Sequence, residues 1–484
     1  MMNSSTCLRS FSKLSLDRTA HASLTSRTLF APQTACFSTS TGYRAQVTSK
    51  AKKPVAPRRG EKTLNVKKGK KAPNYDMGKR PNPGERKAQR KRIVLSNNNA
   101  LAVASLQDLS PKNVLDPSIE GKVMGFPEEI VDALRAEEAF KPSQGWGLFR
   151  RPAALVRKET AQLATLIKAV EDAKAEKQPR TIRRLVTGDL MSGKSTLLLQ
   201  GLAMAHLRGW FVINLPNAQE IAFARTDYAP LAGSDPLQYT QDTYTADLLR
   251  QILKGNRAFL EETRMVTKPD LPFPLPANST LKVLVEQGMV NSEFSWAVFT
   301  TLWQELSQPG RPPIMFALDA IAHVMRNSDY LSAEVKPIHG FDLTLIRQFV
   351  DHLSGQKTLA NGGIILGGTS QSNKPATPAL DHFIKVAEAL QSDPDNVPKW
   401  NPYLGVDQRV VDALQGLEDP KQKDFDVLRL GGVSKPEAKA MMEYYAHSGM
   451  LRHTVDDRLV AEKWSLAGMG NVGELERASV RLRL

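Results

Sequence analysis

The segment TGDLMSGKSTLLLQ, residues 187–200, constrains the fold of this chain more than any other part of the sequence. Its Gly188 is followed by four residues and then by Gly193, Lys194 and Ser195, which is the pattern of a phosphate-binding P-loop. The apolar residues before the loop predict a strand, and the run STLLLQGLAMAHL predicts a helix after it. Because WFVINLP then predicts a second buried strand, we expect an α/β fold in which helices flank a parallel sheet, as in P-loop NTPases.

The residue types of this loop suit a phosphate. Glycine at positions 188 and 193 permits the tight backbone path that lets successive amide groups point at an anion. Lys194 can reach the β- and γ-phosphates, the hydroxyl of Ser195 can ligate Mg²⁺, and Thr196 lies at the N-terminus of the helix, where the dipole favours anions. The predicted nucleotide-binding residues are Gly188, Asp189, Leu190, Met191, Ser192, Gly193, Lys194, Ser195 and Thr196.

A further metal-binding position is expected after the apolar run IMFAL, where Asp319 follows. In P-loop proteins an acid at the end of a neighbouring strand holds Mg²⁺, here through water. The alternative is that Asp319 caps the next helix. The following residue is Ala320, whereas many ATP-hydrolysing P-loop machines carry a glutamate there that polarises the attacking water. We therefore predict no catalytic residue and slow or absent hydrolysis.

The strand predicted by GIILGG ends at Thr369 and Ser370, which are candidate sensors of a γ-phosphate. A simple transition from strand to loop is the alternative. The next residues, SNKP, begin like a guanine-reading motif, but Ala376 stands where that motif needs an aspartate. The base is therefore left open, and the expected cofactor is GTP or ATP, or GDP or ADP, with Mg²⁺.

Positive charge is concentrated in the first part of the chain. The formal net charge is +15, yet residues 1–92 hold 22 Lys and Arg against 4 acidic residues, so the remainder is slightly acidic. That remainder offers no bulk electrostatic reason to bind nucleic acid.

Residues 1–44 contain Ser, Thr and Arg, a single acid and no apolar core, which predicts a transit peptide and a location in the mitochondrial matrix. An ordinary basic tail is the alternative.

Residues 45–95 form a basic extension that we expect to be disordered when alone, because apolar residues are too sparse for a core. About 17 positive charges between Lys50 and Arg92 can neutralise several phosphates, which favours contact with RNA. A solubilising tail is the alternative. No apolar run reaches the roughly 18 residues of a transmembrane helix, so we expect no stable membrane insertion.

The rest of the chain is predicted to have three parts. Residues 96–180 form a connector with helices, residues 181–390 form the P-loop nucleotide-binding domain, and residues 391–484 form a C-terminal helical, lid-like subdomain. Within the last part, Ser434 and Glu437 have the spacing of a capping box and mark the start of a helix.

Several stretches together resemble the death-associated protein family of mitochondrial small-ribosomal-subunit proteins. The resemblance runs from about Leu155 to the C-terminus and is carried by GDLMSGKSTLLLQ, WFVINLPNAQEIAFARTDY, LQYTQDTYTADLLRQILKGN, IMFALDAIAHV, GGIILGGTSQS and EYYAHSGML. It implies a P-loop domain of AAA+-like type that binds a guanine or adenine nucleotide. By position, the nucleotide site would comprise Gly188, Gly193, Lys194, Ser195 and Asp319.

The same resemblance implies a structural role in the head of the mitochondrial small ribosomal subunit. The implied partners are the small-subunit rRNA, neighbouring mitochondrial ribosomal proteins, and the large subunit through intersubunit bridges. A freestanding mitochondrial AAA+ or GTPase-type enzyme is the alternative, although it would need a catalytic carboxylate or glutamine. A membrane-associated apoptotic adaptor is a third reading, for which the sequence offers no membrane segment.

Overall fold

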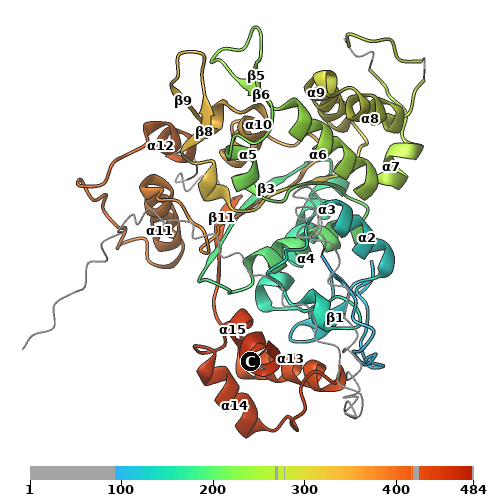
Figure 1. Cartoon of the computed structure of the whole chain (residues 1–484), viewed down its shortest axis with the longest axis vertical. Coiled ribbons are helices and arrows are strands. Elements are labelled where there is room, and N and C mark those ends of the chain that lie inside the picture. The colour runs from blue at the N-terminus through green and yellow to red at the C-terminus, as the bar shows by residue number, and fades with distance from the viewer. Residues whose placement is uncertain (1–92, 268–270, 277, 416, 418–423, 482–484) are drawn as a thin grey trace, which may run out of the picture. The chain divides into compact units, whose positions relative to one another are not determined.

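The computed structural model describes residues 93–267, 271–276, 278–415, 417 and 424–481, and Figure 1 shows their elements along the chain. The predicted transit peptide, 1–44, lies outside the described residues, as does the predicted basic extension apart from its last three positions. The strands are β1 (Val123–Gly125), β2 (Ala153–Leu155), β3 (Thr181–Gly188), β4 (Phe211–Leu215), β5 (Ala229–Pro230), β6 (Tyr239–Thr240), β7 (Ile314–Leu318), β8 (Asn327–Leu331), β9 (Pro337–His339), β10 (Gly363–Gly368) and β11 (Phe425–Leu430).

Helices connect and cover these strands. The α-helices are α2 (Glu128–Ala136), α3 (Lys158–Ala175), α4 (Lys194–Leu207), α5 (Ala218–Ala222), α6 (Asp242–Gly255), α7 (Arg257–Glu262), α8 (Leu281–Val290), α9 (Ser295–Leu306), α10 (Thr344–Leu353), α11 (Pro378–Ser392), α12 (Gln408–Gln415), α13 (Lys435–His447), α14 (Asp457–Leu466) and α15 (Val472–Glu476). No helix of the described residues is long and apolar enough to cross a membrane.

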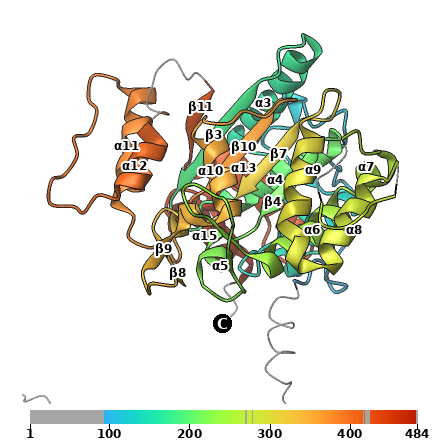
Figure 2. The same cartoon turned by 90° about the horizontal axis from the view of Figure 1, so that it is seen from above.

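A parallel sheet of five strands, in the order β11-β3-β10-β7-β4, organises the described part of the chain. Figure 2 shows this order, with α11 and α12 beyond the β11 edge and α6, α8 and α9 beyond the β4 edge. The α/β fold with helices around a parallel sheet, predicted from the sequence, is thereby confirmed. The carboxyl ends of all five strands share one edge of the sheet, and that edge is where α/β proteins place their ligands.

The sheet is buried on both faces, and its inner strands β7 and β10 carry apolar residues or glycine at successive positions. Ile364 and Leu366 of β10 pack with the side chains of α3 and α4, whereas Ile365 between them packs on the opposite side with α10. β3, β7 and β4 also contribute residues to both clusters. This alternation follows from the two-residue period of a strand, and it fixes the helix after the P-loop firmly against the sheet.

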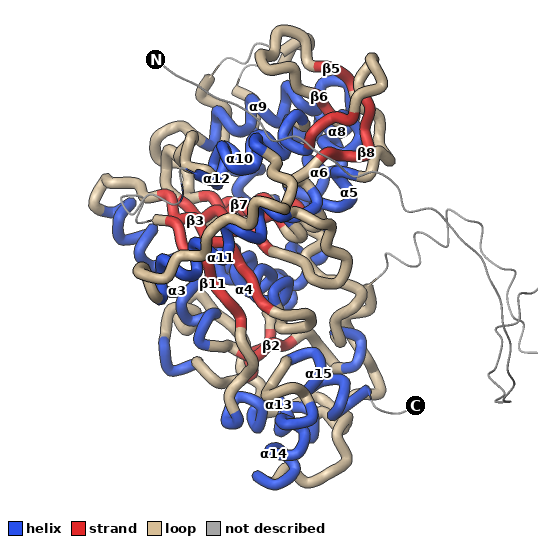
Figure 3. The backbone as a smooth tube through the Cα atoms, turned by 90° about the vertical axis from the view of Figure 1, so that its left-hand side faces the viewer, coloured by secondary structure: helices blue, strands red, loops and turns tan. Residues whose placement is uncertain are grey.

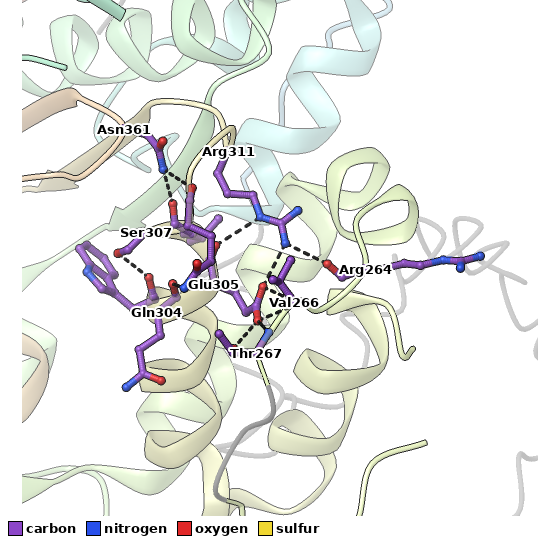
Figure 4. Close-up of polar contacts among 11 residues, drawn as sticks. Arg264, Val266, Thr267, Gln304, Glu305, Ser307, Arg311 and Asn361 are labelled. Atoms are coloured by element: carbon purple, nitrogen blue, oxygen red, sulfur yellow. Dashed lines mark hydrogen bonds and ion pairs between the residues drawn. The ribbon is translucent and has the colours of Figure 1, made fainter. Parts of the chain in front are cut away.

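On the side of β4, a buried carboxylate anchors the chain that leaves α7. Glu305 of α9 has no exposed surface, and it accepts hydrogen bonds from the backbone N–H of Val266 at 3.0 Å and of Thr267 at 2.7 Å. Oε2 of Glu305 also forms an ion pair with the guanidinium of Arg311 at 3.0 Å. That guanidinium donates in addition to the carbonyl oxygen of Arg264 at 2.8 Å (Figure 4). A buried carboxylate is tolerated when it is paired and hydrogen-bonded in this way.

The segment after residue 390 does not form helices alone. β11 lies within the 391–484 region that we expected to be a helical subdomain, and it pairs with β3 along the edge of the main sheet. The sheet therefore takes its fifth strand from beyond the range 181–390. Helix α12 precedes this strand, and α13, α14 and α15 follow it. Helices α13, α14 and α15 gather beyond the end of β11 (Figure 3), around a separate apolar cluster that includes Met442 and Tyr445.

Candidate nucleotide site

The P-loop joins the end of β3 to the start of α4, as its sequence predicts. Gly193 has a φ of +96°, in the left-handed region, and Gly188 has a φ of +147°. A side chain at Gly188 would also bring its Cβ to 2.7 Å from the carbonyl oxygen of Leu430 on β11. Both positions therefore need glycine, and the loop can turn tightly around the N-terminus of α4.

Lys194 lies across this loop. Its side chain is buried, and Nζ donates to the carbonyl oxygens of Gly188 at 2.9 Å and of Asp189 at 2.5 Å. Burial lowers the pKa of Lys194 from its usual value, while the carboxylates of Asp319 and Asp189 oppose that shift. The ammonium is thus held at the mouth of the loop, where a phosphate could replace the carbonyl oxygens as its partner.

Ser195 and Asp319, the two predicted Mg²⁺ residues, are in contact. The hydroxyl of Ser195 donates to Oδ2 of Asp319 at 2.7 Å, and the backbone N–H of Ala320 donates to Oδ1 at 2.9 Å. The short 3-10 helix Ile321–His323 that follows has no side-chain cap, so Asp319 does not serve as its cap.

These oxygen donors suit Mg²⁺, which prefers a few protein oxygens together with phosphate and water. Within the described residues no group of three His, Cys, Asp or Glu side chains could hold a metal by itself. A site of this kind would therefore depend on the oxygens of a bound nucleotide. The metal role of Ser195 and Asp319 remains a prediction.

Thr369 and Ser370 follow β10 and border the same cavity as the P-loop. The hydroxyl of Thr369 donates to the carbonyl oxygen of Val186 at 3.1 Å, and the hydroxyl of Ser370 lies 3.2 Å from that of Ser372. Both hydroxyls thus have protein partners, and Ser370 is the less buried of the two. Their role as phosphate sensors also remains a prediction.

A cavity of about 450 Å³ opens above the P-loop. Its volume falls within the roughly 300–1,000 Å³ typical of small-molecule sites. Its polar lining includes the P-loop, the start of α4, and Lys141 and Gln144 from the segment before β2. Its apolar lining comes mainly from β2, from the segment before it and from the C-terminal helices, which also contribute Glu476. Its lining includes Ala154, Leu155, Met441, Tyr444, Tyr445 and Val472.

Aromatic rings form part of the apolar lining of the cavity. Phe149 stacks on Tyr445 with their ring centroids 5.3 Å apart, and Phe149 also contacts Tyr444 at 5.0 Å. Burial raises the pKa of Tyr444 to about 12 and raises that of Tyr445 well above its usual value, so both phenols are neutral near pH 7. The cavity therefore brings the P-loop residues together with apolar and aromatic side chains.

Three residues of the site had no signal in the sequence. Nζ of Lys141 lies 3.5 Å from Oδ2 of Asp319, and Nε2 of Gln144 donates to the hydroxyl of Thr196 at 3.1 Å. Arg157, which is buried, donates to the carbonyl oxygen of Ser192 at 2.9 Å. All three come from the segment that we predicted to be a connector. Gln144 and Arg157 reach the P-loop or its helix, and Lys141 reaches Asp319, through tertiary folding that no local motif predicts.

Ser372 of the guanine-like motif SNKP borders the cavity. Lys374 pairs with Asp381 of α11, and neither of these two residues lines the cavity. The motif therefore adds nothing to the choice between guanine and adenine.

A model of the family described as mitochondrial ribosomal death-associated protein 3 matches residues 154–478. The chain belongs to this family. The small ribosomal subunit protein mS29 of Neurospora crassa is 44% identical to it over 421 residues, which cover 86% of this chain and 87% of the relative. The resemblance identified from the sequence is thereby confirmed, and the matched range includes the P-loop, Asp319 and the aromatic pair Tyr444 and Tyr445.

Two solved structures are more distantly similar to this family member. The ORC2 protein of Aeropyrum pernix, in its ADP form, is 12% identical, with a TM-score of 0.32 over 67% of this chain and 61% of that one. The HORMA:CdnC:Trip13 complex of E. coli MS115-1 contains a chain that is 13% identical, with a TM-score of 0.25 over 75% of this chain and 83% of that one.

Proposed function

We propose that this chain is a structural component of the small subunit of the mitochondrial ribosome and that it holds a purine nucleotide with Mg²⁺ at its P-loop. The observation that carries the ribosomal part is the match to the Neurospora crassa small-subunit protein over 86% of the chain. The proposed location is the mitochondrial matrix, in the head of the subunit. The proposed partners are rRNA, neighbouring ribosomal proteins and the large subunit through intersubunit bridges.

The nucleotide part of the proposal is supported by the composition of the cavity. Lys194 and the glycine-rich loop provide the anion-binding end, and the wall around Phe149 and Tyr445 provides an apolar surface for a base. The strand order supports a P-loop domain of AAA+-like type, because β10 separates the P-loop strand β3 from β7, which ends at Asp319. We propose that the bound nucleotide stabilises the chain rather than driving a cycle.

Hydrolysis is expected to be slow or absent because no acid stands where a water-activating base is needed. Asp319 is followed by Ala320, which has a left-handed φ of +61° and no ionisable side chain. Among the described residues that line the cavity, the one carboxylate is that of Glu476, and it pairs with Arg481 at 2.7 Å. Turnover well below about one per second, the low end of ordinary enzymes, is expected.

The ribosomal part is tested by sedimenting a mitochondrial lysate through a sucrose gradient and locating the chain by immunoblot. Co-sedimentation with the small subunit is expected. A chain that stays in the light fractions while the subunits sediment would instead indicate a freestanding protein.

The nucleotide part is tested on the same particles by acid extraction and mass spectrometry. One purine nucleotide per particle is expected from the wild type and none from Lys194→Ala. The matched control is Lys168→Ala, because Lys168 is exposed on α3. Equal nucleotide in the Lys194→Ala and control particles would refute the assigned site.

A further inference from the structure

A second lysine stands beside the predicted metal position. Nζ of Lys141 lies 3.5 Å from Oδ2 of Asp319, the same oxygen that accepts from Ser195, and it also donates to the carbonyl oxygen of Pro216. Pro216 directly follows β4 and Asp319 directly follows β7. Lys141 therefore bridges the carboxyl ends of two strands, and about one fifth of its side chain (22%) stays exposed, at the border of the cavity.

The position of Lys141 is fixed by its own segment. The backbone N–H of Lys141 donates to Oε1 of Gln144 at 2.9 Å, and the indole of Trp146 donates to the same oxygen at 2.5 Å. The other end of the Gln144 amide donates to Thr196 on the first turn of α4. The segment is thus attached to the P-loop helix. Gln144 fixes the backbone of Lys141, so the position of the lysine does not depend on its long side chain alone.

The local charge is unusual for a site that is expected to bind Mg²⁺. Lys141 is in direct contact with Asp319, and the charge of Lys194 also interacts with that of Asp319. A second fixed cation repels a divalent metal and attracts the terminal phosphate of a nucleotide, and both effects are strong in a partly buried site. The arrangement therefore reduces the share of the phosphate charge that a bound metal has to balance.

We propose that Lys141 binds the terminal phosphate and supplies, from within the chain, part of the positive charge that Mg²⁺ provides in other P-loop sites. Nucleotide binding by this chain then depends only weakly on Mg²⁺. The inference rests on the proposed nucleotide site. It adds to that site a residue that no P-loop motif contains and a property, weak metal dependence, that the motif does not predict.

A purely structural tether is the competing explanation. In that case Lys141 serves only to hold the carbonyl oxygen of Pro216, and removing it would weaken nucleotide binding equally with and without the metal. A coupling between Lys141 and Mg²⁺ distinguishes the two explanations, because only a charge that shares a task with the metal makes the effect of one depend on the other.

The experiment measures the affinity of the purified full-length chain for methylanthraniloyl-GDP and methylanthraniloyl-ADP by fluorescence, in excess Mg²⁺ and in EDTA. Removing Mg²⁺ should weaken nucleotide binding by the wild type less than about tenfold. The same removal should weaken binding by Lys141→Met by a factor at least about tenfold larger, which is within the usual range of coupling between two sites. Lys168→Met, on the exposed face of α3, is the matched control and should behave as the wild type.

Lys141→Gln distinguishes the effect of the positive charge from that of the hydrogen bond to Pro216. The glutamine amide can still donate to the carbonyl oxygen of Pro216, but it carries no charge. This variant should resemble Lys141→Met, and Lys141→Arg should resemble the wild type. Circular dichroism melts identify any variant that fails to fold, in which case the Gln and Arg variants decide. An equal metal dependence in wild type and Lys141→Gln overturns this inference alone, whereas a wild type that binds neither probe in either buffer overturns the proposed nucleotide site as well.

Discussion

The backbone N–H of Gly473 donates a hydrogen bond of 3.0 Å to the carbonyl oxygen of Met191, so the first turn of α15 rests on the tip of the P-loop. Next to it, the amide of Asn471 donates to the carbonyl oxygen of Leu190 at 2.8 Å, while its Oδ1 caps α15. Met191 itself has a left-handed φ of +61°. The C-terminal helices therefore hold the loop in an uncommon conformation, and occupancy of the loop should be linked to their order.

Replacing Gly473 by alanine tests this link. A Cβ at position 473 would lie 2.7 Å from Cβ of Met191 and 3.1 Å from its carbonyl oxygen, so α15 must move away from the loop. Overpacking of this kind costs about 1–3 kcal/mol. We expect Gly473→Ala to lower the free energy of unfolding in urea by that amount and to weaken nucleotide binding.

The control is Gly431→Ala, because a Cβ at Gly431 meets no atom within 4 Å and its φ is not in the left-handed region. This variant should change stability by less than about 0.5 kcal/mol, as surface substitutions usually do. If Gly473→Ala binds nucleotide as tightly as the control, the contact between α15 and the loop has no part in binding.

Arg157 should be a second point at which the loop is held. Its guanidinium donates to the carbonyl oxygen of Ser192 in the loop and, at 2.8 Å, to that of Gly431 after β11. Replacement by methionine leaves two carbonyl groups without their charged donor, a loss of about 2 kcal/mol in unfolding free energy. Arg157→Lys should recover only part of it, because one ammonium lacks the fork that reaches both oxygens.

Urea denaturation of the full-length chain measures the effect of these substitutions. Arg135→Met provides the comparison, since Arg135 is exposed on α2 and its ion-pair partner among the described residues is Asp132 of the same helix. A result in which Arg157→Met is no less stable than Arg135→Met would show that the two loop contacts contribute nothing measurable.

The P-loop and its sheet could be predicted because their signals are local. The spacing from Gly188 to Ser195 and the apolar runs of β3, β4, β7 and β10 are each readable within about ten residues. The position of Asp319 follows from the same logic, since the carboxyl ends of parallel strands share one edge. The contact of Asp319 with Ser195 agrees with this expectation. The roles of both residues as Mg²⁺ ligands remain predictions.

The remaining features could not be predicted because their signals are weak or distant. β11 is an edge strand whose sequence, FDVLRL, includes Asp426 and Arg429, so it lacks the uncharged run of β7 and β10. Lys141 reaches Asp319, and Arg157 reaches the loop, from a segment with no motif of its own. Contacts of this type depend on how distant segments pack, which propensity and periodicity do not encode.

Removing the buried carboxylate of Glu305 should release the chain after α7. Burial by itself would raise the pKa of Glu305, but the hydrogen bonds from Thr267 and Val266 and the pairing with Arg311 outweigh it, so the pKa lies below its usual value. Glu305→Ala leaves Arg311 without its partner, and breaking a buried pair on one side costs about 3–5 kcal/mol.

The conservative variant makes this prediction specific. Glu305→Gln keeps an acceptor for Thr267 but loses the charge, so it should be less destabilising than Glu305→Ala. Thermal melts followed by circular dichroism would rank the variants. Equal melting temperatures for Glu305→Ala and the wild type would contradict the anchoring role.

A last prediction concerns pH. Burial lowers the pKa of His352 to about 4, although its hydrogen bond to the carbonyl oxygen of Gln348, at 2.7 Å, favours the protonated form. The ring packs against Trp303 with centroids 4.9 Å apart and is almost fully buried. Between pH 6.5 and about 4 the unfolded chain therefore binds a proton that the folded chain does not. The stabilisation by neutral His352 is fully present above pH 6.5 and is lost as the pH falls toward 4.

From this shift, His352 should account for a loss of about 2 kcal/mol of unfolding free energy between about pH 7.5 and about pH 5. Urea titrations at the two pH values measure the loss. His352→Leu should reduce it by that amount, whatever its effect on stability at the higher pH, and His453→Leu, at an exposed position, is the matched comparison. His323 and His339 also have pKa values lowered first by burial, so part of the acid sensitivity should persist in the variant. A His352→Leu protein that loses as much stability on acidification as the His453→Leu protein would show that His352 is not the residue responsible.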